Sequence, residues 1–347
     1  MNEDIYNLEN YNYELPSELI AQTPIDNRTS SRLLVLERLS NRIYERKFND
    51  IIDLLKKDDC LVLNNTKVIK ARIIARKSTG AKIEVFLINK IDGGIWEVLI
   101  KPVKRIQPGM LLSLEKEKAM SVEIIEKTRQ GWTVRFVPED IEKHLDKIGM
   151  TPLPPYIKVP LKDSRKYQTV YAQKEGAVAA PTAGMHFDNG LLEEIKQKGV
   201  NIVYITLHCG LGTFRPVTVK NIKEHTMHSE WIEVDGESAE KINIAKKNNN
   251  RVIAVGTTAI RTLETLGFQM PWGFGVKAYS GPTNKYITPG YEFKIVDAVL
   301  TNFHTPCSTN LVLISAFCGY SFLMRAYQSA ISGKFRFFSF GDAMFII

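Results

Sequence analysis

The sequence predicts an α/β main domain, with a mixed sheet and flanking helices, into which a small all-β barrel domain is inserted. Between residues 68 and 138, segments of strand length follow one another with glycine turns and no helix, whereas helix signals lie on both sides. With 347 residues, 44% of them hydrophobic, the chain is long enough for two domains. We therefore expect the main domain at 1–66 and 154–347, and the barrel at 67–153.

The first part of the main domain carries two apolar strands. It is expected to contain a short amphipathic helix and then the strands, at 17–22, 33–36 and 60–63. The second strand ends at Asn64-Asn65-Thr66-Lys67, and short polar residues after an apolar strand usually mark a turn at a sheet edge. Arg28 and Arg32 surround Thr-Ser-Ser, which suits a phosphate or carboxylate site. Solvated surface charges explain these two arginines equally well.

The central region predicts a small closed barrel. Strands are expected at 68–76, 82–89, 95–100, 110–114, 122–126 and 132–137. Basic residues recur along the region and just before it: Lys67, Lys70, Arg72, Arg76, Lys77, Lys101, Lys104 and Arg105. They would suit docking of a phosphate backbone, although solvated strand faces would give the same pattern.

Two runs rich in Gly, Ala, Pro and Thr organise the second part of the main domain. The first ends at His186 and Phe187, and the second begins at His208. Such residues let the backbone approach a ligand closely, and each histidine can move a proton near neutral pH. Between the runs, Asp188 is placed to cap a helix, and a strand at 201–207 follows. Two ordinary turns would fit, but two histidine-bearing loops at element ends favour a pocket.

A strand at 251–255 runs directly into Gly256-Thr257-Thr258 and a helix at 259–266 that carries Arg261. Such a turn exposes N–H groups and hydroxyls at a helix N-terminus, which favours an anionic ligand group. Plain N-capping is the alternative. Further on, a strand is expected at 295–300, and then a helix capped by Ser308 or Thr309.

Composition limits the classes of function. The net charge of +8 and a pI near 9.1 suit a polyanionic partner. The four cysteines have no metal-type spacing and the N-terminus is no signal peptide, so we expect a cytoplasmic protein. The longest apolar run, 311–318, is too short to span a bilayer. Dinucleotide, Walker and metalloprotease motifs are absent, and we predict no metal site.

Taken together, these stretches resemble the S-adenosylmethionine:tRNA ribosyltransferase-isomerase family of the queuosine pathway. The resemblance extends over essentially the whole chain in the same order of motifs. The matching pieces include Ser31-Arg32-Leu33-Leu34, Leu63-Asn64-Asn65-Thr66-Lys67, Tyr167-Gln168-Thr169-Val170-Tyr171-Ala172, the two histidine-bearing runs, Met227-His228-Ser229-Glu230, Gly256-Thr257-Thr258, Thr301-Asn302-Phe303-His304 and Gly341-Asp342-Ala343-Met344. Thr305 and Cys307 depart from the family pattern, and so does the stretch after Gly319.

The resemblance implies a specific reaction. The ribosyl part of S-adenosylmethionine would be transferred to 7-aminomethyl-7-deazaguanine at the wobble position of a tRNA with a GUN anticodon, and isomerised. Epoxyqueuosine would form, and adenine and methionine would leave. S-adenosylmethionine would be a substrate, no separate cofactor would be needed, and the enzyme would act as a monomer. The alternatives are a tRNA-binding S-adenosylmethionine-dependent methyltransferase and a non-catalytic RNA-binding protein.

Such chemistry needs at least two acid/base groups, because a base must remove an acidified C5′ proton and adenine must leave with a proton or a hydrogen bond. The catalytic candidates are His186 and His208, placed by hypothesis together beside the ribose, with His228, Glu230 and Asp342 as further candidates. The substrate-binding candidates are Arg32, Thr182, Gly210, Gly212, Thr213, Arg215, Thr257, Thr258, Arg261 and His304. Among them, Arg32, Arg215 and Arg261 would hold the methionine carboxylate or tRNA phosphates.

Overall fold

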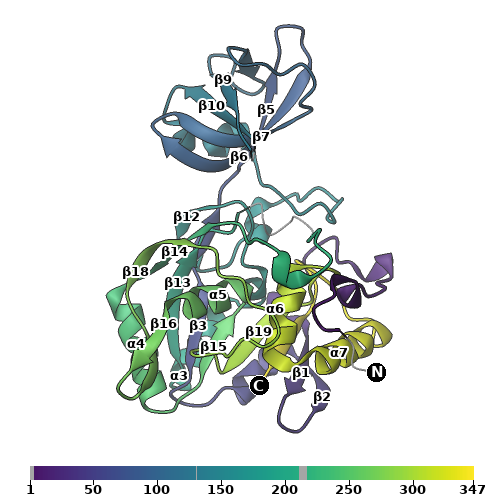
Figure 1. Cartoon of the computed structure of the whole chain (residues 1–347), viewed down its shortest axis with the longest axis vertical. Helices are drawn as coiled ribbons and strands as arrows, with labels where there is room; N and C mark the ends of the chain where they lie inside the picture. The colour runs from purple at the N-terminus through teal and green to yellow at the C-terminus, as the bar shows by residue number, and fades with distance from the viewer. Residues whose placement is uncertain (1–3, 130, 211–216) are drawn as a thin grey trace. The chain divides into compact units, whose positions relative to one another are not determined.

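The computed structural model describes residues 4–129, 131–210 and 217–347 (Figure 1). The chain divides into two compact units. The larger, called the main unit, comprises Met1–Lys67, Pro155–Lys174 and Ala180–Ile347. The smaller, called the barrel unit, comprises Val68–Pro154 and Glu175–Ala179. The boundaries predicted at 67 and 153 differ from this division by one residue each, and the sequence did not indicate that 175–179 belongs with the barrel.

The main unit is built on a mixed sheet with the order β18-β14-β13-β3-β15-β19-β20-β1-β2, as far as its residues are described. The strands are β1 (Arg32–Glu37), β2 (Arg42–Lys47), β3 (Cys60–Asn64), β13 (Asn201–Leu207), β14 (Glu230–Val234), β15 (Val252–Val255), β18 (Tyr279–Thr283), β19 (Ala298–Asn302) and β20 (Ala343–Ile346). β13, β3, β15 and β19 run parallel, and β20 runs antiparallel to β19. β1 is parallel to β20.

Helices cover this sheet. They are α1 (Ile51–Leu54), α3 (Asn189–Gln197), α4 (Gly236–Lys247), α5 (Thr257–Leu266), α6 (Thr309–Cys318) and α7 (Tyr320–Ser332). One face packs against α1 and α3, where Leu191, Leu192 and Ile195 enter the core. Because β3, β15 and β19 are buried along their whole length, the other face must be covered too, and α4 and α5 contact β3 and β15. A small hairpin, β16 (Gly267–Met270) and β17 (Gly273–Val276), lies beside α4.

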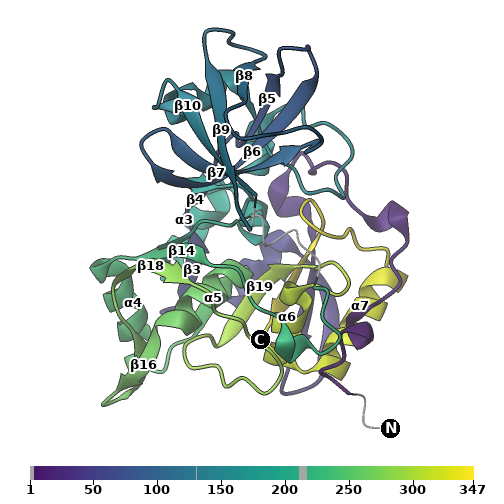
Figure 2. The ribbon, with the colours of Figure 1, turned by 45° about the horizontal axis from the view of Figure 1, so that its top comes forward.

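The strand directions bring many chain segments to one edge of the sheet, here called the polar edge. The carboxyl ends of β13, β3, β15 and β19 lie there, together with the starts of β14, β20 and β1. Figure 2 shows β3, β19 and α5 in this part of the main unit. Buried polar residues gather at these strand ends: Ser31, Asn64, Asn65, Thr66, Glu230, Thr257, Asn302 and Asp342. Burial of a polar group costs free energy unless the group is hydrogen-bonded, and ligands of α/β proteins bind at the carboxyl ends of the strands. The polar edge is therefore the candidate location of a binding site.

The barrel unit contains an antiparallel sheet with the order β11-β5-β6-β7-β10-β9-β8, closed by a pairing of β5 with β8. Its strands are β5 (Arg72–Arg76), β6 (Lys82–Asp92), β7 (Ile95–Lys101), β8 (Leu111–Leu114), β9 (Ser121–Lys127), β10 (Trp132–Val137) and β11 (Gly149–Met150). The remaining elements near the unit boundary are β4 (Thr66–Val68), β12 (Lys174–Ala177) and α2 (Leu145–Ile148). Burial alternates along β5, β7 and β8, as closure around a core requires. The predicted fold class is therefore confirmed.

Four local predictions were wrong, the fourth of them at the strand expected at 295–300. The helix expected at 17–22 is a short 3-10 turn, Ser17–Leu19, because Ile20 forms a bridge with Phe337. The strand expected at 68–76 is broken, because β4 ends at Val68 and β5 starts at Arg72. Helix α5 begins at Thr257, two residues before its predicted start.

The strand expected at 295–300 starts instead at Ala298, because a buried carboxylate takes the preceding N–H groups. Glu264 Oε1 accepts from the N–H groups of Ile295 and Val296, each at 3.0 Å. Its Oε2 accepts from Lys294 N–H and the Tyr291 hydroxyl, also at 3.0 Å. One carboxylate on α5 thus replaces a row of sheet hydrogen bonds.

We expect Glu264→Gln to lower the free energy of unfolding by roughly 1–3 kcal/mol, because an amide N–H₂ would face donors that now have an acceptor. Urea denaturation measures this change. Glu240→Ala on exposed α4 surface is the control, and it should change stability by less than about 0.5 kcal/mol. Equal stability of both variants would contradict the role given to Glu264.

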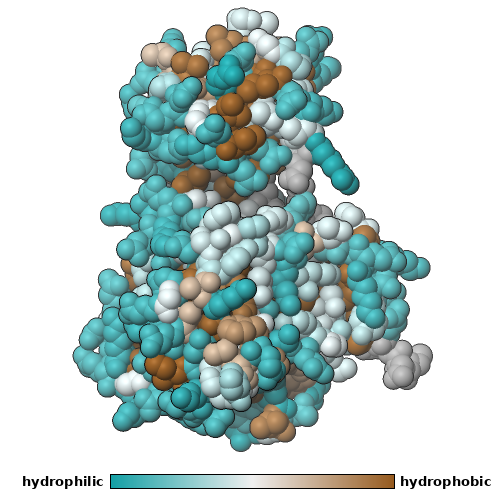
Figure 3. Space-filling model, turned by 60° about the vertical axis from the view of Figure 1, so that its left-hand side comes forward, coloured by the Kyte–Doolittle hydropathy of each residue, from teal (hydrophilic) through white to brown (hydrophobic). Residues whose placement is uncertain are grey.

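On the face shown in Figure 3, hydrophilic residues cover most of the surface, and apolar residues form smaller patches. Among the described residues, no single helix is long and apolar enough to cross a bilayer. Helices α6 and α7 reach that length and composition only as a pair, and they are bent by 114° at their junction.

Candidate functional site

His186 lies at the polar edge in a buried hydrogen-bonded network. It ends a 3-10 turn, Thr182–His186, and its ring stacks on Phe48 with centroids 4.9 Å apart. Nδ1 lies 2.8 Å from Ser31 Oγ, and Nε2 lies 3.1 Å from Asn302 Nδ2. Burial lowers the pKa of His186 to about 3, so the imidazole is neutral at physiological pH.

Asn302 determines which nitrogen of His186 carries the proton. Its Oδ1 accepts from Thr182 Oγ1 at 2.8 Å, and its Nδ2 faces the backbone oxygen of Asp342 at 3.4 Å as well as the imidazole. Reversing the amide would set an oxygen against the Asp342 carbonyl, so Nδ2 is the donor to Nε2. The proton of His186 therefore sits on Nδ1 and is donated to Ser31. Both ring nitrogens are occupied, which leaves neither free to act on a substrate.

This tautomer gives a pH prediction. Because the folded-state pKa lies below the ordinary 6.5, protons favour the unfolded chain, and His186 costs stability as the pH falls from 6.5 toward 3. By NMR, the ring is expected not to titrate above pH 4 in the native protein. Asn302→Asp places a carboxylate against Nε2 and should raise the His186 pKa by about 1 to 3. A His186 pKa that is the same in both proteins would contradict the assignment.

Asp342 and the backbone of Arg32 also lie at the polar edge, and they are hydrogen-bonded to each other. The Asp342 carboxylate accepts from Arg32 N–H at 2.9 Å and from Arg336 N–H at 2.8 Å. Burial raises the pKa of Asp342. The Arg32 guanidinium points elsewhere: it pairs with Glu45 at 2.6 Å and lies 3.7 Å over the Phe335 ring. Asp342 thus holds the start of β1, and the Arg32 side chain is bound away from this cluster.

A small cavity of about 30 Å³ lies beside His186. Its lining includes Arg28, Ser31, Thr182, His186 and Gly341. The Arg28 guanidinium donates to the carbonyls of Gln168 at 2.7 Å and Met185 at 3.3 Å. Of the two arginines beside Thr-Ser-Ser, it is Arg28, rather than Arg32, that reaches this cavity.

His208 lies farther along the polar edge, directly after β13. Its Nδ1 is 2.8 Å from Thr66 Oγ1, and its Nε2 has no hydrogen-bond partner among the described residues. The Asn64 side chain holds the strand end by bonding both the N–H and the carbonyl of Leu207, each at 3.0 Å. The ring is half-buried, and burial lowers the His208 pKa. His208 is therefore a neutral imidazole with one nitrogen available.

A buried ion pair lies next to this histidine. Arg261 Nη1 donates to Glu230 Oε2, and only 6% and 4% of the two side chains are exposed. Glu230 Oε1 accepts from Gly210 N–H at 2.8 Å, and Arg261 Nε donates to Lys285 O at 2.9 Å. Arg261 Nη2 is buried and has no partner among the described residues. The pair holds the chain just after His208 and leaves one donor unused.

The N-terminus of α5 lies at the centre of the polar edge. Gly256 takes φ 86°, in the left-handed region that favours glycine, and α5 starts without a side-chain cap. Thr258 Oγ1 is buried and has no partner among the described residues, and it lies one helical turn from Arg261. A methyl placed on Gly256 would lie 3.6 Å from Ala183, so the His186 turn passes close by. Free amides, a hydroxyl and a guanidinium together suit a carboxylate.

The two histidines are not a pair. His208 follows β13, and His186 is bonded to Asn302 at the end of β19, with β3 and β15 between these strands. Three strand spacings separate the two strand ends by about 14 Å. This strand order argues against the expectation that both imidazoles meet beside one ribose, because β3, β15 and the start of α5 lie between the two strand ends.

The comparisons with known proteins agree with this arrangement of motifs. A family model described as queuosine biosynthesis protein matches residues 8–346. An S-adenosylmethionine:tRNA ribosyltransferase-isomerase of Acetivibrio thermocellus is 48% identical over 98% of this chain and 99% of its own. One of Staphylococcus saprophyticus is 49% identical over the same shares. The crystal structure of S-adenosylmethionine tRNA ribosyltransferase from Thermotoga maritima is 36% identical, covers 97% of this chain and 100% of its own, and has a TM-score of 0.56.

The chain belongs to the S-adenosylmethionine:tRNA ribosyltransferase-isomerase family. It is thus a transferase and isomerase of queuosine biosynthesis, as the motifs predicted. Within this family member, the polar edge is the candidate active site.

Other predicted site residues of this family member have separate positions. His304 is partly buried, with Nε2 2.9 Å from Thr301 Oγ1, and desolvation of the ring lowers its pKa to about 3. His228 lies two residues before β14 and has no hydrogen bond to its ring among the described residues. Gly212, Thr213 and Arg215 lie outside the described residues. No group of three or more His, Cys, Asp or Glu in the described part of the chain could hold a metal ion.

Sequence reasoning missed Asn302, Ser31 and Thr66 as site residues. All three are small polar residues at strand ends, and each hydrogen-bonds a histidine side chain. The signal available in the sequence was the polar triplet Asn64-Asn65-Thr66 after an apolar strand. This triplet predicted a turn, but it did not indicate which histidine the turn would contact.

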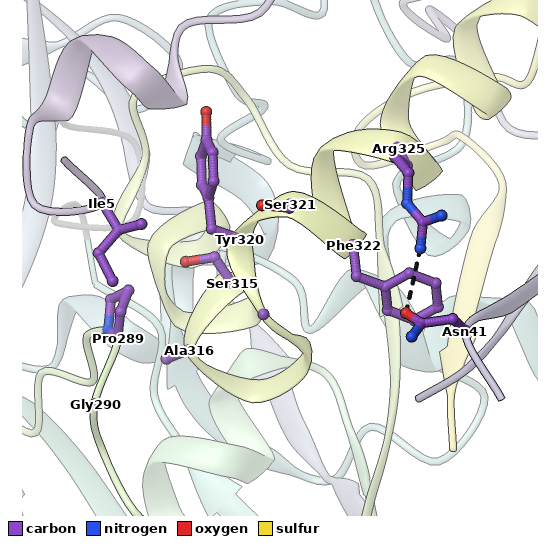
Figure 4. Close-up of a pocket in the computed structure, with 11 residues that line it drawn as sticks. Ile5, Asn41, Pro289, Gly290, Ser315, Ala316, Tyr320, Ser321, Phe322 and Arg325 are labelled. Carbon is purple, nitrogen blue, oxygen red and sulfur yellow. Dashed lines mark hydrogen bonds between the residues drawn. The ribbon is translucent and has the colours of Figure 1, made fainter. Parts of the chain in front are cut away.

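A larger cavity, of about 560 Å³, lies away from the polar edge (Figure 4). Its wall includes Asn41, in the turn that ends β1, and that turn is at the end of β1 opposite to Arg32. Tyr320, Phe322 and Arg325 line it from α7, and Arg325 Nη2 donates to Asn41 Oδ1 at 3.2 Å. Its described lining contains no histidine and no carboxylate, so none of the candidate acid/base residues lies in it.

Proposed function

We propose that this enzyme transfers the ribosyl part of S-adenosylmethionine to 7-aminomethyl-7-deazaguanine at the wobble position of a tRNA with a GUN anticodon. Isomerisation of the ribose gives epoxyqueuosine, and adenine and methionine are released. The observation that carries the proposal is the polar edge, where the uncapped start of α5, with the unpartnered Thr258 hydroxyl and Arg261 Nη2, shares one sheet edge with the half-buried His208, whose Nε2 is unbonded among the described residues.

His208 is proposed as the base. The sulfonium of S-adenosylmethionine acidifies its neighbouring C5′ hydrogens, so a neutral nitrogen within reach can remove one of them. The lowered pKa keeps His208 unprotonated at pH 7, and Nε2 is available while Thr66 holds Nδ1. His186 is instead proposed as a positioning residue, because both of its nitrogens are bonded within the protein.

The start of α5 is proposed to bind the methionine carboxylate. Thr257 and Thr258 would offer N–H groups at the positive end of the helix, and Arg261 Nη2 would donate from one turn below. Glu230 neutralises the rest of the guanidinium and holds Gly210, so it belongs to the support of the site rather than to proton transfer. The Thr182 hydroxyl donates a hydrogen bond to Asn302, so Thr182 could contact the substrate only at the position next to Asn302.

The target base would have to leave its stack to meet a buried strand edge, as enzymes that act on bases require. S-adenosylmethionine enters as a substrate, and no step of the proposal calls for a separate cofactor or a metal. The enzyme is proposed to act as a monomer.

One experiment tests the proposal. The enzyme is incubated with S-adenosylmethionine and a tRNA carrying the 7-aminomethyl base, and both the small products and the digested tRNA are analysed by mass spectrometry. Free adenine, free methionine and epoxyqueuosine are expected. S-adenosylhomocysteine with a methylated base would identify a methyltransferase, and unchanged reactants with bound tRNA would identify an RNA-binding protein.

A further inference from the structure

The two ends of the barrel differ sharply in charge. Strand directions place the connections β5–β6, β7–β8 and β9–β10 at one end, and 92–94, 115–120 and 138–148 at the other. The first three connections, 77–82, 101–110 and 127–131, contain seven basic residues and no Asp or Glu: Lys77, Lys82, Lys101, Lys104, Arg105, Lys127 and Arg129. The other end contains seven Asp or Glu and four Lys. We call the first the basic end.

The cations of the basic end are unneutralised. Among the described residues, none of the seven forms an ion pair. Cations elsewhere on the barrel do pair: Lys147 with Glu117, Lys143 with Asp140 and Lys90 with Glu142. Of the basic residues first considered for phosphate binding, Lys70, Arg72 and Arg76 are paired with Asp146, Glu84 and Glu115. Charge that is left unpaired and exposed at one end remains available to a polyanion.

The loop that presents these cations is held in place. Lys77 Nζ donates to the carbonyls of Lys104 at 3.1 Å and Arg105 at 2.8 Å. Arg105 takes φ 59°, in the left-handed region that side chains rarely adopt, and Arg76 Nη1 bonds Gly80 O at 2.9 Å across the neighbouring hairpin. Lys101, Lys104 and Arg105 are all exposed. One lysine thus supports a fixed loop on which three cations face solvent.

We infer that the basic end of the barrel is a docking surface for the phosphate backbone of RNA. The inference rests on the proposed function, which supplies a tRNA as partner, and it identifies the part of the protein that holds it. Phosphate contacts position a nucleic acid without reading its sequence, and lysine and arginine on fixed loops make them. The nearest carboxylate in the strand register, Glu84 opposite Lys101, is already turned to Arg72 at 3.6 Å.

The test compares two variants with the same change in net charge. The first is Lys101→Gln/Lys104→Gln/Arg105→Gln, which leaves Lys77 to hold the loop. The control is Lys118→Gln/Lys143→Gln/Lys147→Gln at the other end. The affinity of the full-length protein for a fluorescent tRNA transcript is measured by anisotropy at several KCl concentrations.

The basic-end variant is expected to bind the transcript at least about tenfold more weakly at 0.1 M salt, with the salt slope reduced by about 2 to 3. The control should stay within about twofold of the native protein, since its lysines lie among carboxylates. Equal loss in both variants, or no loss in the first, would overturn the inference. Vesicles of anionic phospholipid are a second probe, and a loss confined to vesicles would assign the surface to a membrane instead.

Kinetics separate this inference from the proposed reaction. If both hold, the basic-end variant shows a raised KM for tRNA and a native kcat for adenine release at saturating tRNA. Adenine release with an unchanged KM for tRNA would refute the surface and leave the reaction standing. Weaker tRNA binding by the variant, when even the native enzyme releases no adenine, would support the surface and refute the reaction.

Discussion

Replacing His208 by alanine is expected to lower kcat for adenine release by roughly 10²- to 10⁴-fold, the usual contribution of a positioned general base. At the polar edge, Nε2 of His208 is unbonded among the described residues, and Thr66 orients the ring by its contact with Nδ1. Rates are measured by quantifying adenine with the modified tRNA and S-adenosylmethionine at saturation.

The pH profile makes the prediction sharper. A general base must be unprotonated to act, and burial lowers the pKa of His208. The rate should therefore rise with pH only in the acid range, and the ionisation of His208 should no longer change the rate near pH 7. Thr66→Val should leave the imidazole in place, reduce kcat less than His208→Ala, and move the acid limb of the profile. His144→Ala, on the barrel unit, is the control and should keep native rates. A native rate for His208→Ala would remove this residue from the chemistry.

Breaking the buried ion pair is expected to have the largest effect on stability. Arg261→Met leaves the Glu230 carboxylate, only 4% exposed, without its guanidinium partner. Loss of one partner from a buried pair costs roughly 3–5 kcal/mol, because the other charge stays out of water. Urea denaturation of the native and variant proteins measures the difference in unfolding free energy.

The double variant Glu230→Gln/Arg261→Met is the matched control. It removes both charges, so it should recover most of the lost stability. Adenine release should stay impaired, because the guanidinium that is proposed to donate to the methionine carboxylate is gone. If the single and double variants were equally destabilised, simple loss of packing would explain the result. If Arg261→Met cost less than about 1 kcal/mol, water or another group would be solvating Glu230 and the pair would not be buried in solution.

Much of the fold could be predicted because its signals are local. Asp188 accepts from Leu191 N–H at 2.8 Å, as its place before an apolar helix indicated, and the strand after it spans Asn201–Leu207 as expected. The barrel strands were found for the same reason, since glycine turns and alternation depend on near neighbours. Where local signals compete with distant partners, prediction failed. Ile20 was predicted to be helical, but it forms a β-bridge with Phe337, which is far away in the sequence.

The candidate site shows the same division. The histidine-bearing loops, the Gly256 turn and Arg261 could be picked out from residue types and spacing as suited to the chemistry. Their partners could not, because Ser31 meets His186 across 155 positions and Thr66 meets His208 across 142. A hydrogen bond between such distant residues leaves no periodic trace in the chain.

The amino-acid sequence alone was enough to establish the family, the two-part architecture and the residue types that the chemistry needs. Which histidine is free depended on the packing of the chain. The order of the strands sets His186 and His208 at separate points of one sheet edge, and the groups that meet each ring occupy both nitrogens of the first and one nitrogen of the second. Proton transfer depends on an unbonded lone pair, and that property belongs to the packed neighbours of a residue rather than to the residue itself.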